Sequence, residues 1–269
     1  MKKRLLLAFA VALTPALAAQ QQSSSTLPGD PQTLLRMAAP FYDYASADMK
    51  PWHVRYGYRA FNQQGHPEGE GTFDFWSMGK ITKASWTQGD VVSNEWQTAG
   101  KKFVSGTTTG IPSLTHRLYG VFRPGFLSML EPSGSDRPLK SFSSQSSSSA
   151  PLTCVGSVRP AAADKVLSLD STWPAYCFSQ NGQDPVLSAS HENGTLVNIY
   201  SHDQKFQSHY FPGDIEIRYV GTKRVEANLQ VLEEVAPDNS AFTPSADAKA
   251  PVPPKSITVP LITVPTVMK

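Results

Sequence analysis

Apolar and polar residues alternate along most of the chain, and this alternation predicts β-strands. The alternating segments are rich in aromatic and β-branched residues, and Gly, Pro or Asn residues separate them. We expect strands at residues 52–61, 73–78, 81–88, 91–96, 101–106, 152–158, 175–179, 185–190, 195–201, 205–211, 214–220 and 225–235. Asn193-Gly194 lies between two of these patterns and is the strongest hairpin signal in the chain.

Two short helices interrupt the strands. Asp30 is a helix N-cap followed by Pro31 at the first helical position, and an amphipathic stretch continues to residue 39. A second helix is expected to begin behind Ser113, with one apolar face formed by Leu114, Leu118, Val121 and Phe122. Because strands follow one another without alternating with helices, the predicted fold class is α+β with an antiparallel sheet. A parallel nucleotide-binding sheet is disfavoured.

The stretch 73–96 carries Phe and Trp residues on what the register makes two different faces. If Met78-Gly79 and Gln88-Gly89 are two-residue turns, Asp74 lies opposite Lys83 and forms a cross-strand pair. One face then carries Phe73, Phe75, Ala84, Trp86 and Val91, and the other carries Trp76, Ile81 and Trp96. We expect the first set to face a core or cavity and the second to be structural packing. Burial of the rings alone would also account for the first set.

The first residues have the three parts of a secretory signal peptide, expected to span residues 1–19. Three basic residues precede a short apolar run, which small residues follow. The run is too short for a membrane anchor, so the chain is expected to be exported, to the periplasm, and not to span a membrane. Without this leader, 21 basic residues stand against 22 acidic ones, which changes the formal net charge from +2 to −1. No basic tract for nucleic acid remains.

Composition divides the rest of the chain into three parts, of which the middle one contains a long loop. Residues 20–29 are expected to be disordered, residues 30–236 to form one folded domain, and residues 132–151 to be a Ser-rich loop within it. Residues 237–269 are rich in Pro and poor in aromatic residues, which predicts an extended, disordered tail. Cys154 and Cys177 are the two cysteines, and in an oxidising compartment a disulfide worth about 3 kcal/mol is expected, with two free thiols as the alternative.

The sequence contains no recognisable catalytic motif. There is no nucleophile elbow, P-loop, dinucleotide fingerprint or zinc-protease motif. The six histidines form no metal-ligand spacing, and no pair among Glu70, Asp74 and Glu95 has a spacing that indicates glycoside chemistry. We therefore predict no catalytic residues, no metal, no cofactor and no enzymatic activity.

Two long segments resemble a known family. PWHVRYGYRAFNQQGHPEGEGTFDFWSMGKITKASWTQGDVVSNEWQTAGKKFVSG resembles the first strands of exported lipoprotein-carrier-like (LolA/LolB-like) domains, and HYFPGDIEIRYVGTKRVEANLQVLEEV resembles their closing strands. This resemblance covers about residues 32–235. It implies a strongly curved antiparallel sheet, a half-barrel, that wraps one or two helices and an apolar cavity. The tail APVPPKSITVPLITVP is similar to the linker that precedes a TonB-type domain in some of these proteins, but only the carrier-like domain is expected to carry over.

The sequence supports three hypotheses for function. The first is a non-enzymatic periplasmic carrier that holds a lipid or other apolar ligand, and its expected ligand-binding residues are Phe73, Phe75, Trp86, Leu114, Leu118, Val121 and Phe122. The alternative is an envelope scaffold protein related to TonB-system accessory domains. In that case the Pro-rich tail, through its Ile/Val-Thr-Val-Pro repeats at 257–264, would add a strand to a cell-envelope partner. A hydrolase is a third, weaker reading, because a site need not have a motif.

Overall fold

The computed structural model describes residues 27–122, 139–144, 151–157, 175–192 and 195–251. Within these residues the helical elements are α1 (Pro31–Tyr42), η1 (Ser113–Arg117), α2 (Leu118–Val121) and η3 (Ser240–Phe242). The strands are β1 (Trp52–Phe61), β2 (Pro67–Met78), β3 (Ile81–Gln88), β4 (Val91–Thr98), β5 (Lys101–Gly106), β6 (Leu139–Ser144), β7 (Leu152–Ser157), β8 (Ala175–Asn181), β9 (Asp184–Glu192), β10 (Leu196–Ser201), β11 (Gln204–Phe206), β12 (His209–Phe211), β13 (Asp214–Tyr219) and β14 (Thr222–Glu234). No helix within the described part of the chain is both long enough and apolar enough to cross a membrane.

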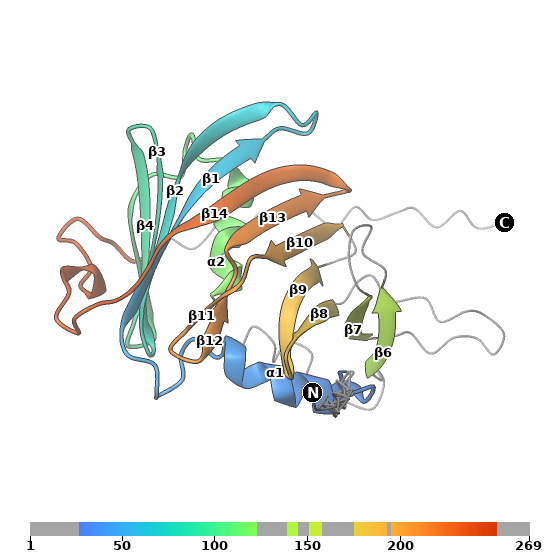
Figure 1. Ribbon diagram of the computed structural model, residues 1–269. Helices are drawn as coiled ribbons and strands as arrows, with labels where there is room; N and C mark the ends of the chain where they lie inside the picture. Colours follow the sequence, from blue (N-terminus) through green and yellow to red (C-terminus); the bar gives the residue numbers. More distant parts are fainter. Residues whose placement is uncertain (1–26, 123–138, 145–150, 158–174, 193–194, 252–269) are drawn as a thin grey trace, which may run out of the picture.

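Twelve of these strands form one antiparallel sheet in the order β5-β4-β3-β2-β1-β14-β13-β10-β9-β8-β7-β6. Two meanders meet where β14 pairs with β1, so that Tyr58 lies opposite Ala227. The sheet curves around α2, with α1 along its lower rim, and it does not close, because β5 and β6 are its two ends (Figure 1). The predicted α+β half-barrel is confirmed.

Strand β14 helps to bend the sheet because it contains two irregularities. Gln230 is an extra residue opposite the Arg55–Tyr56 step of β1, and Arg224 is an extra residue opposite the Ile217–Arg218 step of β13. Each β-bulge increases the local twist and bends its strand. The bends therefore fall at the junction of the two meanders.

The hairpins of β2–β3 and β3–β4 correct the predicted register. Their turn residues are Gly79-Lys80 and Gly89-Asp90, one position later than predicted, so Phe73 pairs with Trp86 and Asp74 with Ser85. Both glycines come first in their turns with φ of 59° and 56°, which suits the hairpin turn that needs glycine at its first central position. The shift is two residues, so the predicted faces are unchanged, but the predicted Asp74–Lys83 pair is wrong.

The helix predictions are partly correct. Helix α1 begins where expected, and the Asp30 carboxylate accepts a hydrogen bond of 2.7 Å from the Thr33 amide. The second predicted helix is instead a 3₁₀ turn, η1, followed by the single turn of α2. Its N-cap is Pro112 without a side-chain hydrogen bond, so the predicted Ser113 cap is wrong.

Three regular segments lie where the sequence indicated loops or a single strand. Strand β6 falls inside the predicted Ser-rich loop 132–151, and the predicted strand 205–211 lies in the small hairpin β11–β12, which turns at Gln207-Ser208. Leu27 packs on the core, so the folded part begins before residue 30. Residues 1–26, 193–194 and 252–269, which include the predicted signal peptide, the Asn193-Gly194 turn and most of the predicted tail, lie outside the described residues.

Residues 237–251, which we call the strap, fold onto the sheet although the sequence indicated a disordered tail from residue 237. Trp96 donates a hydrogen bond of 2.9 Å to the Ala241 carbonyl, and Phe242 is buried. Further along, Val104 of β5 and Lys249 exchange two backbone hydrogen bonds of 2.8 and 2.9 Å. The strap lies beside β4 in Figure 1, so the folded structure continues beyond residue 236.

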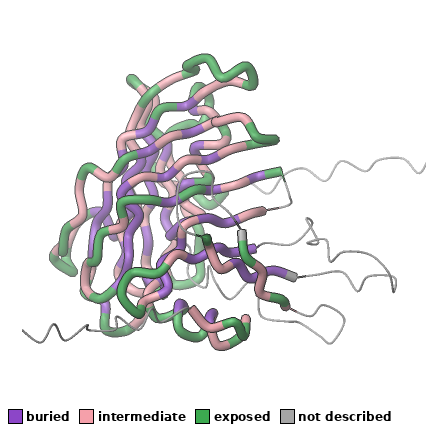
Figure 2. The backbone as a smooth tube through the Cα atoms, turned by 45° about the vertical axis from the view of Figure 1, so that its right-hand side comes forward, coloured by how far each residue is buried: buried purple, intermediate pink, exposed green. Residues whose placement is uncertain are grey.

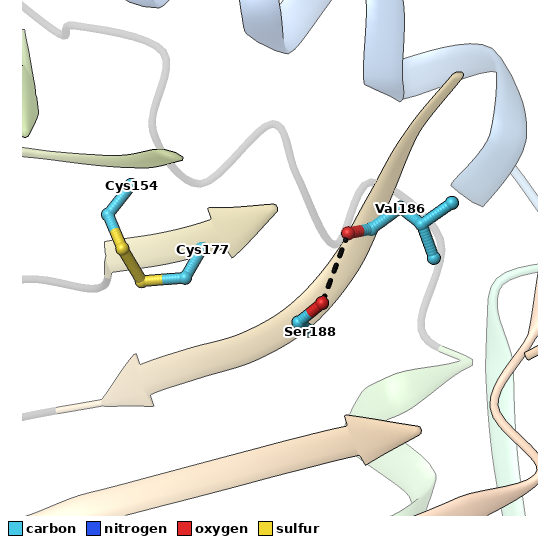
Figure 3. The surroundings of a disulfide bond; sticks show 4 residues. All are labelled: Cys154, Cys177, Val186 and Ser188. Carbon is cyan, nitrogen blue, oxygen red and sulfur yellow. Dashed lines mark hydrogen bonds between the residues drawn. A yellow bond between two sulfur atoms is a disulfide. The ribbon is translucent and has the colours of Figure 1, made fainter. Parts of the chain in front are cut away.

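The predicted disulfide is confirmed between Cys154 of β7 and Cys177 of β8, which are direct cross-strand neighbours (Figure 3). Both cysteines are buried with Ala189 in a small cluster separate from the main core.

The main core fills the concave side of the sheet. Buried positions run along the middle of the strands, and exposed positions gather at the turns (Figure 2).

Candidate functional site

The concave face brings the predicted ligand-binding residues together. Phe73, Phe75 and Trp86 project from β2 and β3 and are at most 2% exposed. The short η1–α2 segment lies opposite them; Leu118, Val121 and Phe122 are buried there, and Leu114 is partly buried. The set predicted to face an interior therefore does face the concave side, whereas its role in ligand binding stays a prediction.

Phe122 is the centre of this assembly. It is 1% exposed and follows the last residue of α2. Its ring packs against those of Tyr44, Trp52, Tyr56, Phe73, Phe75 and Phe211, with centroid distances of 5.5–6.2 Å. The side chain thus plugs the concave face with an aromatic group.

The plug leaves little free space. A residual cavity of about 10 Å³ lies beside Val121, lined also by Tyr42, Tyr44, Leu187, Tyr200, Asp203 and Pro212. This is about the space of one water molecule. The arrangement is a closed one, in which any larger guest must displace side chains.

A small number of polar contacts hold the η1–α2 segment against the sheet. Trp86 donates a hydrogen bond of 3.2 Å to the Thr115 carbonyl of η1, and Arg117 forms an ion pair of 3.1 Å with Glu192 of β9. The centre of the His116 ring lies 4.5 Å from that of the Trp86 ring. Burial lowers the pKa of the His116 imidazole. Since the Arg117 and Glu192 side chains are both partly exposed, their pair contributes little to stability.

Several residues of the concave face were not among the predicted site residues. Tyr44 and Tyr56 donate hydrogen bonds of 2.6 Å to the carbonyls of Tyr210 and Pro212, and burial raises the pKa of both phenols. Trp52 and Phe211 complete the aromatic shell. The alternation of residues 52–61 contained the signal for Trp52 and Tyr56, whereas nothing local indicated that Tyr44 or Phe211 would join them.

Asp203 lies at the residual cavity, where burial raises its pKa to about 6 from the usual 3.8. The folded state therefore binds a proton more tightly than the unfolded state. This contribution to stability is fully present below about pH 4 and is lost as the pH rises through about 6.

We expect Asp203→Asn to remove the loss of folding stability that the wild type shows as the pH rises through about 6. In urea unfolding the variant should match the wild type at pH 4 and exceed it at pH 8 by up to about 3 kcal/mol, the equivalent of the pKa change. Asp90→Asn, in the exposed β3–β4 turn, is the matched control and should leave the pH profile unchanged. Identical profiles for the wild type and Asp203→Asn would contradict the buried placement.

The opposite, outer face of β1 and β2 holds a buried charged cluster. Asp74 Oδ1 lies 2.7 Å from both His53 Nε2 and Arg55 Nε. His53 Nδ1 lies 2.9 Å from Glu233 Oε1. Because a carboxylate only accepts, both ring nitrogens must carry hydrogen for both contacts to be hydrogen bonds. The Trp76 ring stacks on His53 at 4.5 Å.

The predicted outer tryptophan row surrounds a lysine. Lys83 Nζ lies 4.7 Å from the Trp76 ring centre and 5.2 Å from that of Trp96. Burial lowers the pKa of this amine. The strap covers Trp96, so these tryptophans pack between sheet, strap and charged side chains.

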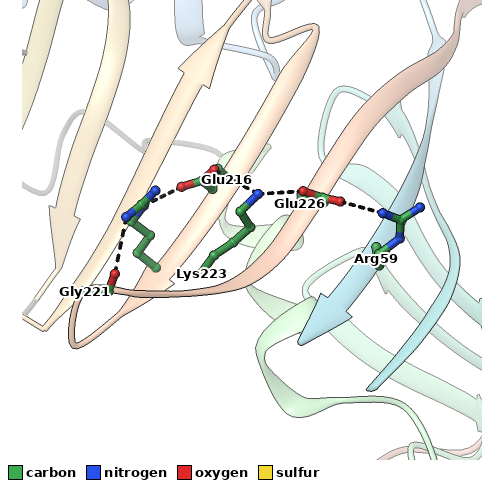
Figure 4. Close-up of polar contacts among 6 residues, drawn as sticks. Arg59, Glu216, Gly221, Lys223 and Glu226 are labelled. Carbon is green, nitrogen blue, oxygen red and sulfur yellow. Dashed lines mark hydrogen bonds and ion pairs between the residues drawn. The ribbon is translucent and has the colours of Figure 1, made fainter. Parts of the chain in front are cut away.

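An open groove of about 770 Å³ also lies on the outer face, across β2, β1, β14, β13 and β10. Its floor includes Gly57, and the Gln230 side chain occupies the space that a Cβ at this position would need. A ladder of ion pairs links Arg218, Glu216, Lys223, Glu226 and Arg59 along the groove (Figure 4). Its three cations alternate with two carboxylates, so every charge in the ladder has a partner and the ladder itself carries one net positive charge. Among the described residues there is no group of three side chains that could hold a metal ion.

Comparisons with known proteins match the architecture and nothing finer. No model of a known protein family matches the chain, and no curated protein matches it. Among solved structures, a LolA superfamily protein from Nitrosomonas europaea aligns with a TM-score of 0.47 and 11% identity, covering 80% of this chain and 97% of that chain.

Two further solved structures give similar values. A domain assigned to an outer membrane lipoprotein-sorting protein from Vibrio parahaemolyticus aligns with a TM-score of 0.42 and 8% identity, covering 80% of this chain and 97% of that one. A DUF1329 family protein from Desulfovibrio piger aligns with a TM-score of 0.42 and 10% identity, covering 79% and 97%. The expected resemblance to lipoprotein-carrier-like half-barrels is thus found as a likeness of fold alone, and a TonB context is not part of it.

Proposed function

We propose that this protein is an exported, non-enzymatic binding protein that holds an acyl chain or another apolar ligand on the concave face of its half-barrel. The ligand takes the volume that Phe122 fills in the closed arrangement, after the η1–α2 segment has moved. The proposed binding residues are those expected from the sequence, together with Trp52 and Tyr44.

The observation that supports this proposal is the way the concave face is covered. A large aromatic surface on the sheet is covered by one 3₁₀ turn and one helical turn, whose buried side chains are Leu118, Val121 and, at the centre, Phe122. Aromatic and aliphatic walls of this kind suit an apolar guest. A cover this short is held mainly by its side chains, so a guest that replaces those side chains keeps the apolar surface buried.

We expect Phe122→Ala to bind 11-(dansylamino)undecanoic acid, a fluorescent fatty acid, at least about tenfold more tightly than the wild type. The wild type must expose or rebury the phenylalanine, whose burial is worth about 1.5–3 kcal/mol, before the ligand enters. The measurement is a fluorescence titration well below the unfolding temperature of both proteins.

Trp76→Ala removes an aromatic ring from the outer face of the same strand pair and is the matched control. It should bind the probe with the affinity of the wild type. The proposal is wrong if none of the three proteins enhances the probe's fluorescence, or if the two variants bind it equally.

We also propose a second role, in contacts with a cell-envelope partner. The strap pairs Lys249 with Val104 of the edge strand β5, two residues before Pro251, the last described residue ahead of 252–269. Their β-branched residues would suit strand addition to a partner. Deletion of residues 252–269 should abolish co-purification of an envelope protein from periplasmic extract and leave fatty-acid binding intact. Unchanged co-purification would contradict this role.

A further inference from the structure

A buried polar network lies on the concave face beside the plug. Asn198 of β10 donates a hydrogen bond of 3.0 Å to Ser190 Oγ, which lies 2.9 Å from Tyr200 Oη. Asn198 Nδ2 also lies 3.5 Å from Glu192, the carboxylate that pairs with Arg117 of η1. The network therefore connects β9 and β10 to η1 through the Glu192–Arg117 ion pair.

One acceptor in this network has no hydrogen-bond donor among the described residues. Asn198 is 4% exposed, and its two N–H groups are directed at Ser190 and Glu192. Its carbonyl oxygen, Oδ1, is buried and has no hydrogen-bond partner among the residues that the structure describes. Buried polar groups are rarely left unpaired, and leaving an acceptor unsatisfied in the interior is costly.

The open acceptor lies on the same face as the proposed ligand site. Asn198 pairs with Ile217, which is fully buried in the main core, so the two side chains share the concave side of the sheet. Tyr200, at the other end of the network, lines the residual cavity beside Val121. A ligand whose chain displaces the plug would therefore end near this network.

We infer that Asn198 recognises the headgroup of the bound amphiphile, and that this headgroup is neutral and carries a hydrogen-bond donor, such as a hydroxyl or amide N–H. This inference rests on the proposed function and names its ligand class. A donor is required because Oδ1 can only accept. A neutral group is favoured because Glu192 is already paired with Arg117, so neither charge is free to neutralise a headgroup.

The test compares two lipids with the same acyl chain. 1-Palmitoylglycerol carries two hydroxyl groups, whereas methyl palmitate carries only acceptors. Both are delivered from cyclodextrin and displace 11-(dansylamino)undecanoic acid from the protein. The wild type should bind 1-palmitoylglycerol about tenfold more tightly, as one hydrogen bond to a buried acceptor allows.

Variants assign the preference to one atom. Asn198→Leu should bind the two lipids equally, whereas Asn198→Asp, which keeps an acceptor, should retain the preference. Asn228→Leu, on the outer face of β14, is the matched control and should behave as the wild type. Circular dichroism establishes that each variant is folded.

The possible results separate this inference from the proposed function. If neither lipid displaces the probe and the probe itself does not bind, the proposed function fails and the inference fails with it. If the wild type binds both lipids equally, the proposed function stands and the headgroup inference is wrong. A preference that persists in folded Asn198→Leu would show that another group recognises the hydroxyl.

Discussion

Trp52→Ala is expected to lower the free energy of unfolding by about 3–5 kcal/mol, the usual cost of removing a large aromatic side chain from a core. Trp52 is 1% exposed, and its ring contacts those of Phe75 and Phe211 at 5.4 and 5.0 Å. Large rings surround Trp52, and they cannot move together to fill the cavity that the Trp52→Ala substitution leaves. Urea unfolding followed by circular dichroism measures the loss.

Trp76→Ala is the control, because it removes the same side chain from the other face of the neighbouring strand. Trp76 is partly exposed and stacks on His53. Loss of that stack should cost about 1 kcal/mol. Equal losses for the two tryptophans would mean that the concave face is not the main core.

Asp74→Ala is expected to cost a similar amount, about 3–5 kcal/mol, for an electrostatic reason. The Asp74 carboxylate is 4% exposed and is the acceptor shared by His53 and Arg55. Its removal leaves the polar hydrogens of His53 and Arg55 without their partner inside a partly closed cluster. Asp74→Asn, which keeps one acceptor oxygen, should lose less.

Glu233→Gln tests the same histidine from its exposed side. The Glu233 side chain is 54% exposed, so water replaces the lost charge and the cost should stay below about 1 kcal/mol. A loss for Asp74→Ala no larger than that for Glu233→Gln would contradict the view that burial makes Asp74 the central group. Denaturant titrations of the three variants at one pH give the comparison.

The outer cluster shows why the sequence assigned Asp74 the wrong partner. The prediction placed the β2–β3 turn one position too early and considered only β3, where Lys83 then stood opposite Asp74. In the structure β14 lies on the other side of β1, so that Glu233, 180 residues from His53 in sequence, completes a cluster to which Asp74 is bound. Lys83 is left between two tryptophan rings. His53 and Arg55 come from β1, the hairpin neighbour of β2, whereas the sheet order, which no local pattern records, brings in Glu233.

The alternation of residues by itself determined which side chains share a face. Side chains in a strand alternate between faces, so the predicted separation of Phe73, Phe75 and Trp86 from Trp76 and Trp96 survived a register error of two residues. The Asp30 N-cap and the pairing of the two cysteines were likewise local or compositional facts. They hold whatever surrounds them.

Only the tertiary structure decided what fills the concave side. Phe122, Tyr44 and Phe211 come from three distant segments, and they meet because the sheet curves and because β14 pairs with β1. The same holds for the strap over Trp96 and for the open oxygen of Asn198. Packing between distant segments depends on their relative placement in space, whereas the pattern along a strand depends only on its own residues.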